Sequence, residues 1–473
     1  MLNITAPDGA RIFEFFEEIS SIPHGSGNTK LIADYLVSFA KVRGLEALRD
    51  SHDNVIIKKK ASEGYSSRPT VILQGHLDMV AEKKANSDVD MTKDALKLYI
   101  DGDFIRAEDT TLGGDDGVAI AYILALLDGS YPHPAIEAVF TADEEIGLIG
   151  AKALDASSLE GKMLINIDSD EEGIFTVGCA GGVRCDTVMT VEREAFCGEV
   201  FKASVSGFKG GHSGVEIDKG RANAIKALGK ALLALGDIRI IDVSGGNADN
   251  AIPRAAECLF ASENDALSLL AKVRSELIAE YGSIEPDMEF SLEKASDEKA
   301  AMPLSRKDTE RVIGLISDTP TGVIAMSRDI EGLVETSLNL GIIRLDDAFR
   351  LTASVRSSLE SEKKKLRDRL KAISLQYSAD YSERGEYPAW EYKPSSYLCD
   401  TMVSVYEKMY NKKPVVQTIH AGLECGIFTE KIEGLECVSI GPDNFDIHTT
   451  EEHLSISSTV RVWEYLLEVL KNI

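Results

Sequence analysis

The sequence predicts an α/β fold in which a mixed sheet flanked by helices forms a discontinuous first domain, interrupted by an inserted α+β domain. In the first 180 or so residues, apolar strand-like runs without strict alternation are separated by patterns of helical period, which is typical of a sheet covered on both faces. From about residue 190 to 388, the strand patterns alternate cleanly and amphipathic helices separate them. After residue 389 the first pattern resumes.

The first domain is expected over residues 1–188 and 389–473. Apolar residues at helical spacing predict its helices at 9–20, 29–42, 117–127, 397–410 and 457–470. Its strands are predicted at the runs NVIIKKK, PTVILQGHLD, LKLYI, IEAVFTA, KMLINIDS, VVQTIH and CVSIGPD.

The inserted domain is expected over residues 189–388 and reads as two successive α+β units, each a sheet with helices on one face. Its strands are predicted at FKASVSGF, AAECLFAS, DMEFSLEKA and FRLTASVRSSL, and its helices at 221–235, 266–281, 309–317 and 360–376. The stretch RGEYPAWEYKPSS, rich in aromatic residues and proline, is interpreted as the linker back to the first domain.

Composition excludes several classes of function. The chain has 473 residues, which is too long for one compact core, and its net charge of -27 disfavours a nucleic-acid or anionic-membrane partner. Seven Cys without a CxxC motif indicate reduced thiols and a cytoplasmic protein. The N-terminus shows no secretory signal, and the longest apolar run, 118–127, is far short of the ~20 residues of a membrane span.

The first candidate for chemistry is the strand end in VILQGHLDMV. His76 and Asp78 share one side of extended backbone, so the carboxylate is expected to orient the imidazole of a metal ligand. The alternative is a surface turn that happens to carry a His and an Asp.

Two further acidic pairs follow. Asp115 and Asp116 in TTLGGDDG precede a strongly apolar helix, where carboxylates also serve as helix caps. Glu144 and Glu145 in VFTADEEIG follow an apolar strand. Adjacent residues on extended backbone point in opposite directions, which favours two different tasks for the two glutamates, or else a solvated turn.

Asp168 opens a stretch, DSDEEG, that is similar to the start of an EF-hand loop. The twelfth position is Cys179, where a calcium loop needs a bidentate Glu, and a strand precedes it in place of a helix. Asp168 therefore fits better as one ligand of a site assembled from distant residues.

Two histidines complete the candidates. FKGGHSG, around His212, is glycine-rich but lacks the GK[ST] ending of a phosphate-binding loop. His448 follows a predicted strand near the final helix. Strand-end sites form at the carboxyl edge of an α/β sheet, and His and carboxylate side chains in such numbers suit a pair of divalent ions.

These motifs together resemble a known family. GHLDMV, TTLGGDDG, TADEEIG and HTTEEH are similar to the ordered motifs of the cocatalytic di-zinc peptidases, which include aminoacylase, carboxypeptidase G and carnosinase. IPHGSGN, GCAGG, KGGHSG, NAIPR, ETSLNLG and HAGLECG resemble the aminoacyl-histidine dipeptidase (PepD, Xaa-His dipeptidase) branch. The resemblance runs from about residue 15 to 460 and implies a zinc-peptidase-like first domain, with an inserted lid of two ferredoxin-like units.

The resemblance implies a role for each candidate. One metal ion would be held by His76, Asp115 and Asp168, and the other by Asp115, Glu145 and His448. The ions would be zinc, with cobalt or manganese as alternatives. Asp78 would orient His76 and Glu144 would be the general base. The peptide bond after Asp115 would be cis.

In the lid, the resemblance implies that His212 steadies the oxyanion and that Asn250 and Arg254 contact the carboxylate end of the substrate. In the first domain, it implies that Glu424 lines the pocket. Relatives often have Asn where this chain has Asp116, which adds negative charge near the metals. Relatives usually have Pro at the position of Thr450, which bears on loop rigidity and not on the ligand His448.

The implied activity is hydrolysis of unblocked dipeptides, including Xaa-His dipeptides, by a metal-bridged hydroxide with Glu144 as base. A broader di/tripeptidase, an N-acyl amino acid deacylase and a catalytically silent metal-binding protein are the alternatives. The small peptide is the expected partner. Relatives often form homodimers through the lid, whereas a doubled lid would let one chain complete its own site.

Overall fold

The computed structural model describes residues 4, 9–295, 302–328 and 330–473. They form two compact units. The first unit comprises Met1–Cys179, Tyr392–Thr418 and Leu423–Ile473, and the second comprises Ala180–Glu391 and Ile419–Gly422. The sequence placed the boundaries at residues 188 and 389. Strand β9 (Gly181–Thr190) crosses the first of these positions and belongs to the sheet of the second unit.

The first unit is built on a sheet in the order β1-β2-β6-β3-β7-β21-β8-β20. Its central strands β6, β3, β7 and β21 are parallel, and strands β1 and β2 at one edge and β8 near the other are antiparallel to their neighbours. The strands are β1 (Glu46–Arg49), β2 (Val55–Lys59), β3 (Val71–His76), β6 (Ile136–Thr141), β7 (Met163–Asn166), β8 (Ile174–Cys179), β20 (Val415–Ile419) and β21 (Glu436–Ser439).

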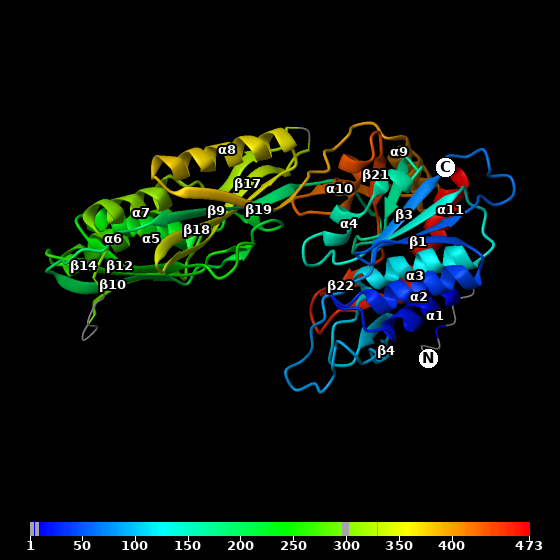
Figure 1. The fold of residues 1–473 in the computed structure, drawn as a ribbon, viewed down its shortest axis with the longest axis horizontal. Coiled ribbons are helices and arrows are strands. Elements are labelled where there is room, and N and C mark those ends of the chain that lie inside the picture. The colour runs from blue at the N-terminus through cyan, green and yellow to red at the C-terminus, as the bar shows by residue number, and fades with distance from the viewer. Residues whose placement is uncertain (1–3, 5–8, 296–301, 329) are drawn as a thin grey trace. The chain divides into compact units, whose positions relative to one another are not determined.

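Helices and a small second sheet complete this unit. The small sheet has the order β22-β23-β5-β4, with β4 (Leu98–Asp101), β5 (Phe104–Ala107), β22 (Asn444–Phe445) and β23 (His453–Ser455). The helices are α1 (Ala10–Ser20), α2 (Lys30–Val42), α3 (Gly114–Asp128), α4 (Ile149–Ala153), α9 (Tyr397–Tyr410), α10 (Glu424–Lys431), α11 (Ile456–Asn472) and the 3-10 turn η1 (Ala156–Ser158). Figure 1 shows α1, α2 and α3 side by side along the large sheet.

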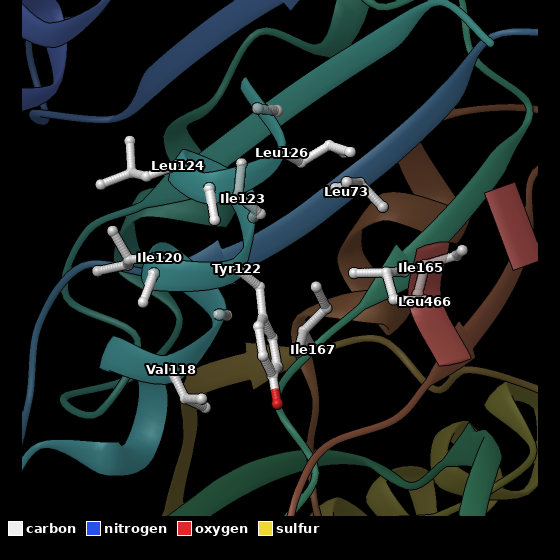
Figure 2. Close-up of a cluster of buried hydrophobic side chains, with 14 of the residues drawn as sticks. Leu73, Val118, Ile120, Tyr122, Ile123, Leu124, Leu126, Ile165, Ile167 and Leu466 are labelled. Atoms are coloured by element: carbon white, nitrogen blue, oxygen red, sulfur yellow. The ribbon is translucent and has the colours of Figure 1, made fainter. Parts of the chain in front are cut away.

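Helix α3 is the centre of the core of this unit. Every residue from Val118 to Leu127 is buried, as expected for a helix that is apolar on all sides. Its side chains pack with Leu73 of β3 and Ile165 of β7 (Figure 2). The hydroxyl of Tyr122 donates to the carbonyl of Thr459 at 2.7 Å, which joins α3 to α11. This packing fixes the start of α3 against the carboxyl ends of the strands.

The second unit has a sheet in the order β15-β10-β14-β12-β17-β18-β9-β19, with β16 beside β17. Its strands are β9, β10 (Glu199–Ser206), β12 (Arg239–Gly245), β14 (Ala256–Ser262), β15 (Glu289–Lys294), β16 (Gly322–Met326), β17 (Val334–Leu345), β18 (Ala348–Ser357) and β19 (Asp380–Tyr387), with a separate pair β11 (Gly211–His212) and β13 (Ala251–Ile252). Its helices, on one face of the sheet in Figure 1, are α5 (Ala224–Leu235), α6 (Leu270–Tyr281), α7 (Arg306–Asp318) and α8 (Glu360–Gln376), and its 3-10 turns are η2 (Ile217–Lys219) and η3 (Ala266–Leu269).

Two βαββαβ units share this sheet, and one is nested within the other. Strands β10, β12, β14 and β15 with α5 and α6 form an inner unit with the ferredoxin-like strand order 4-1-3-2. Strands β9, β17, β18 and β19 with α7 and α8 form an outer unit with the same order. Because β9 precedes the inner unit in the chain, the expectation of two successive units was wrong: the inner unit is inserted after the first strand of the outer one.

Within the described residues, no helix combines the length and the apolar character needed to cross a bilayer.

Candidate active site

Three parallel strands of the first unit end at one edge of the sheet, and each is followed by a chemically active side chain. His76 is the last residue of β3, Glu144 and Glu145 follow β6, and Asp168 follows β7. Since β3 pairs in parallel with both β6 and β7, the carboxyl ends of the strands meet. The sequence prediction that these residues gather at a strand edge is therefore matched by the geometry.

Asp115, at the start of α3, lies between two groups of candidate ligands. Its Oδ1 is 2.9 Å from Nε2 of His76, and its Oδ2 is 3.1 Å from Nε2 of His448. His76 Nε2 is also 3.6 Å from Asp168 Oδ1, and His448 Nε2 is 2.9 Å from Glu145 Oε1. Among the described residues, three groups could hold a metal ion: His76, Asp115 and Asp168; Asp115, Glu145 and His448; and His76, Glu144 and Glu145. The first two groups share the carboxylate of Asp115.

The backbone around these groups is specialised. The peptide bond between Asp115 and Asp116 is cis, as the family resemblance implies. His448, in the loop between β22 and β23, has a φ of 62°, a conformation uncommon for residues other than glycine. The side chain of Asp116 is buried and accepts a hydrogen bond from the amide of His76 at 3.0 Å, which joins the start of α3 to the end of β3.

The buried carboxylates of the site favour a bound cation. Burial raises the pKa of Glu144 well above its ordinary range and raises that of Asp168 to about 6. The ring of His448 donates a hydrogen bond to the carboxylate of Asp115, and this bond and the carboxylate of Glu145 raise its pKa to about 10. Buried carboxylates in such number are stable when a positive charge compensates them.

The donor atoms also fit a metal. In each of the two groups that share Asp115, the candidate ligand atoms lie within 4.8 Å of one another. Oε1 of Glu145 is buried and accepts no hydrogen bond within the described part of the chain, although the ring nitrogen of His448 is 2.9 Å away. A divalent cation that replaced the proton of the imidazole would be bound by both atoms. Imidazole nitrogen and carboxylate oxygen are donors that zinc and neighbouring divalent metals accept.

Asp78 has a different main contact from the expected one. The nearest acceptor for Nδ1 of His76 is the backbone carbonyl of Asp78, at 2.9 Å, whereas the carboxylate is 3.6 Å away. The carboxylate accepts hydrogen bonds from the amides of Glu144 at 2.9 Å and Glu145 at 3.3 Å, and from the hydroxyl of Ser26 at 2.8 Å. Asp78 thus orients His76 through its main chain and fixes the backbone of the glutamate pair through its side chain.

Glu452 is a supporting residue that the sequence reasoning missed. Its buried carboxylate accepts hydrogen bonds from the backbone amides of Leu112, Gly113 and Gly114 at 2.7, 3.0 and 2.8 Å, and from that of Asp115 at 3.3 Å. It therefore holds the glycine turn that presents Asp115. The sequence feature that could have identified Glu452 is its place in the HTTEEH motif, four residues after His448.

Glu424 is not where the family resemblance suggested. It is fully buried at the start of α10, and its Oε2 accepts hydrogen bonds from Gln74 Nε2 at 2.6 Å and from Thr141 Oγ1 at 2.5 Å. Burial raises its pKa to about 7. The carboxylate therefore links strands β3 and β6, and the side chain has no exposed surface in this structure.

His212 belongs to the second unit, where β11 pairs with β13. Its Nδ1 accepts hydrogen bonds from the amides of Gly214 and Val215, each at 3.2 Å, so the proton of the neutral ring is on Nε2. Burial and the charge of Arg356 lower its pKa. The half-buried imidazole is therefore a neutral hydrogen-bond donor through Nε2.

The other two lid candidates are on the same stretch as β13. Asn250 is exposed, and its carbonyl accepts a hydrogen bond from the amide of Ser213 at 2.8 Å. Arg254 is exposed, and its Nε donates to the carbonyl of Phe208 at 3.2 Å. Arg356 of β18 was missed; its charge acts on His212 and His420, and its buried Nε has no hydrogen-bond partner among the described residues.

Comparison with known proteins agrees with this geometry. Residues 72–472 match the model of peptidase family M20/M25/M40. The chain is 37% identical to the cytosol non-specific dipeptidase of Escherichia coli (strain K12), over 98% of this chain and 97% of that protein.

Solved structures point the same way. The crystal structure of aminoacylhistidine dipeptidase from Vibrio alginolyticus superposes with a TM-score of 0.90 at 34% identity, covering 99% of this chain and 98% of that one. The aminopeptidase PepT from Bacillus cereus shares the fold, with a TM-score of 0.57 at 16% identity over 98% of each chain. The chain belongs to peptidase family M20/M25/M40.

Proposed function

We propose that this protein is a metallo-dipeptidase that hydrolyses the peptide bond of unblocked dipeptides, including dipeptides with a C-terminal histidine. The observation that carries the proposal is the sharing of Asp115 between two three-residue groups at the carboxyl edge of the sheet. The names of the E. coli dipeptidase and the Vibrio aminoacylhistidine dipeptidase support the substrate class.

The proposed cofactor is a pair of divalent ions, zinc in the first place, with cobalt or manganese as alternatives. His76, Asp115 and Asp168 would hold one ion, and Asp115, Glu145 and His448 would hold the other. When bound, such ions supply Lewis acidity, which makes a water molecule more acidic and a carbonyl carbon more electrophilic.

Glu144 is proposed as the general base. It would accept a proton from the attacking water and deliver it to the leaving nitrogen. Burial raises the pKa of Glu144 well above its ordinary value, and the carboxylate of Asp78 fixes its backbone amide. Glu145, directed toward His448, has the separate task of metal binding.

His212 is proposed to donate its Nε2–H to the oxyanion that forms during hydrolysis, which assigns the second unit the role of a lid. Asn250 and Arg254 are proposed contacts to the carboxylate end of the substrate. Arg356 offers a second cation for that role, since its charge already acts on His212.

The cytoplasm is the proposed location, supported by the name of the E. coli relative and by seven cysteines without a disulfide pair. A homodimer through the lid remains the proposal for assembly, with completion of the site by a single chain as its alternative.

A substrate panel tests the proposed activity. The purified protein with its metal content measured would be assayed on β-alanyl-histidine, glycyl-histidine, glycyl-leucine, a tripeptide and an N-acetyl amino acid. We expect hydrolysis of the dipeptides and none of the N-acetyl compound. Cleavage of the N-acetyl compound alone would identify a deacylase, equal kcat/KM on the tripeptide a broader peptidase, and metal binding without turnover a silent protein.

A further inference from the structure

The segment 245–251, which carries Asn250, is hydrogen-bonded to strand β17 of the outer βαββαβ unit. Arg344 of β17 donates from Nη1 to the carbonyl of Gly245 at 2.9 Å and from Nη2 to that of Gly246 at 2.6 Å. Gly341, at an irregularity in β17, allows the close approach, because a Cβ there would be 2.8 Å from the Cα of Asp249. The segment 245–251 therefore packs against β17, the strand of the outer βαββαβ unit that pairs with β12 of the inner one.

Asp249 is the centre of this contact. Its Oδ2 accepts a hydrogen bond from Arg184 Nε of β9 at 2.6 Å, and Arg384 Nη2 of β19 is 3.5 Å away. The buried Asn339 of β17 donates from Nδ2 to the backbone carbonyls of Asp249, at 3.0 Å, and Ala251, at 2.8 Å. Strands of the outer unit thus hold both the side chain and the main chain of a segment from the inner unit.

The far end of this segment is bonded directly to the catalytic candidate in the second unit. Ala251 of β13 pairs with His212 of β11, and the carbonyl of Asn250 accepts from the amide of Ser213. The turn that follows β11 supplies the amides of Gly214 and Val215 that fix the tautomer of His212. A displacement of 249–251 would therefore move the imidazole and its donor proton.

We propose that Asp249, held by Arg184 and Asn339, is a positioning residue that sets the location of His212. This inference rests on the proposed function of His212 as an oxyanion donor. It also gives the nested topology a function: the inner unit carries the donor His212, and the outer unit fixes segment 249–251, which pairs with it. The pair Arg184–Asp249 is half exposed on the arginine side, so its value lies in geometry more than in stability.

The test is a double-variant cycle of Asp249→Ala and His212→Ala, with kcat and KM measured for each single variant and for the pair. A misplaced donor costs turnover, so we expect Asp249→Ala to lower kcat about 10- to 100-fold, with a smaller rise in KM that reports displacement of the neighbouring Asn250. In the His212→Ala background, Asp249→Ala should change kcat by less than about twofold, since it has no donor left to position.

Two further variants serve as controls. Asp249→Asn keeps the shape and an acceptor oxygen for Arg184 and should retain most of the turnover. Glu257→Ala removes an exposed ion pair with Lys202 in the same unit, 2.9 Å apart, and should leave kcat unchanged. If Asp249→Ala does not fold, as judged by circular dichroism and the thermal midpoint, Arg184→Ala removes the same pair from the strand side.

The outcomes separate the inference from the proposed function. An unchanged kcat in His212→Ala defeats the oxyanion role itself. A large loss in His212→Ala, combined with wild-type kcat in Asp249→Ala, overturns the positioning role alone. Losses that multiply in the double variant overturn it as well, because they show that Asp249 acts independently of His212.

Discussion

The two units present their candidate residues in opposite ways. In the first, side chains extend from the ends of parallel strands, so the order of the sheet alone brings His76, Glu145 and Asp168 to one edge. In the second, His212 is on the two-residue strand β11 outside the main antiparallel sheet, and its position depends on pairing with β13, which is distant in sequence. The candidate metal ligands are placed by the ends of parallel strands. His212 is placed by contacts between the inner and outer βαββαβ units.

This difference explains what the sequence could predict. An apolar run followed by His or Asp marks a strand end wherever the strand lies in the sheet, so the candidate ligands could be found without knowing the topology. Two features could not be found from strand ends in this way: the cis bond after Asp115, and the hydrogen bonds that Glu452 accepts from the backbone before it. The cis bond was expected only from the family resemblance. The role of Glu452 was missed, because no sequence spacing marks a carboxylate that accepts hydrogen bonds from backbone amides.

The errors in the second unit have one origin. Strand β17 is buried along most of its length, and its Asn339 and Arg344 are hydrogen-bonded to segment 245–251, so the alternation that marks a half-buried strand is lost. The sequence reasoning identified neither β17 nor β9, and it therefore placed the boundary at 188 and predicted successive units. In the first unit, Glu424 was assigned to the substrate pocket by its motif, whereas its burial depends on contacts with Gln74 and Thr141, which lie far away in sequence.

The largest expected effect separates the adjacent glutamates of the first unit. Glu144→Ala should lower kcat by about 10²- to 10⁴-fold and leave the metal content unchanged, because it removes the proton acceptor alone. Glu145→Ala should lower the metal content, because it removes a ligand of the second group. Metal analysis together with kcat measures both effects, and substantial turnover in Glu144→Ala with full metal would refute the assignment of the base.

The matching test in the second unit is His212→Ala. Loss of one donor to the oxyanion should lower kcat by about 10²- to 10³-fold, with metal content and thermal midpoint close to those of the unaltered protein. A change confined to KM would instead assign His212 to substrate binding.

A smaller effect is expected for Asp78→Asn. The amide keeps one oxygen for the backbone of Glu144 and loses the charge beside His76, so the affinity for metal should fall about 10- to 100-fold. Competition with a chelator measures it. An unchanged affinity would limit Asp78 to its main-chain contact with His76.

The smallest effect concerns pH. Burial and Arg356 lower the pKa of His212, so its imidazole is neutral at and above its ordinary pKa of about 6.5 and carries the same donor proton throughout that range. The ratio of kcat between the unaltered protein and His212→Ala should therefore stay constant from about pH 6.5 to 8.5. A ratio that rises as the pH falls through this range would show that the protonated ring is the active form.

The central claim is that two metal ions, sharing Asp115, make this chain a dipeptidase. The most direct measurement removes metal with a chelator, dialyses the chelator away and follows glycyl-histidine hydrolysis while zinc is added back. We predict no turnover without metal and full recovery at two equivalents per chain, one for each group. Turnover that survives complete metal removal, or full recovery at one equivalent, would contradict the account.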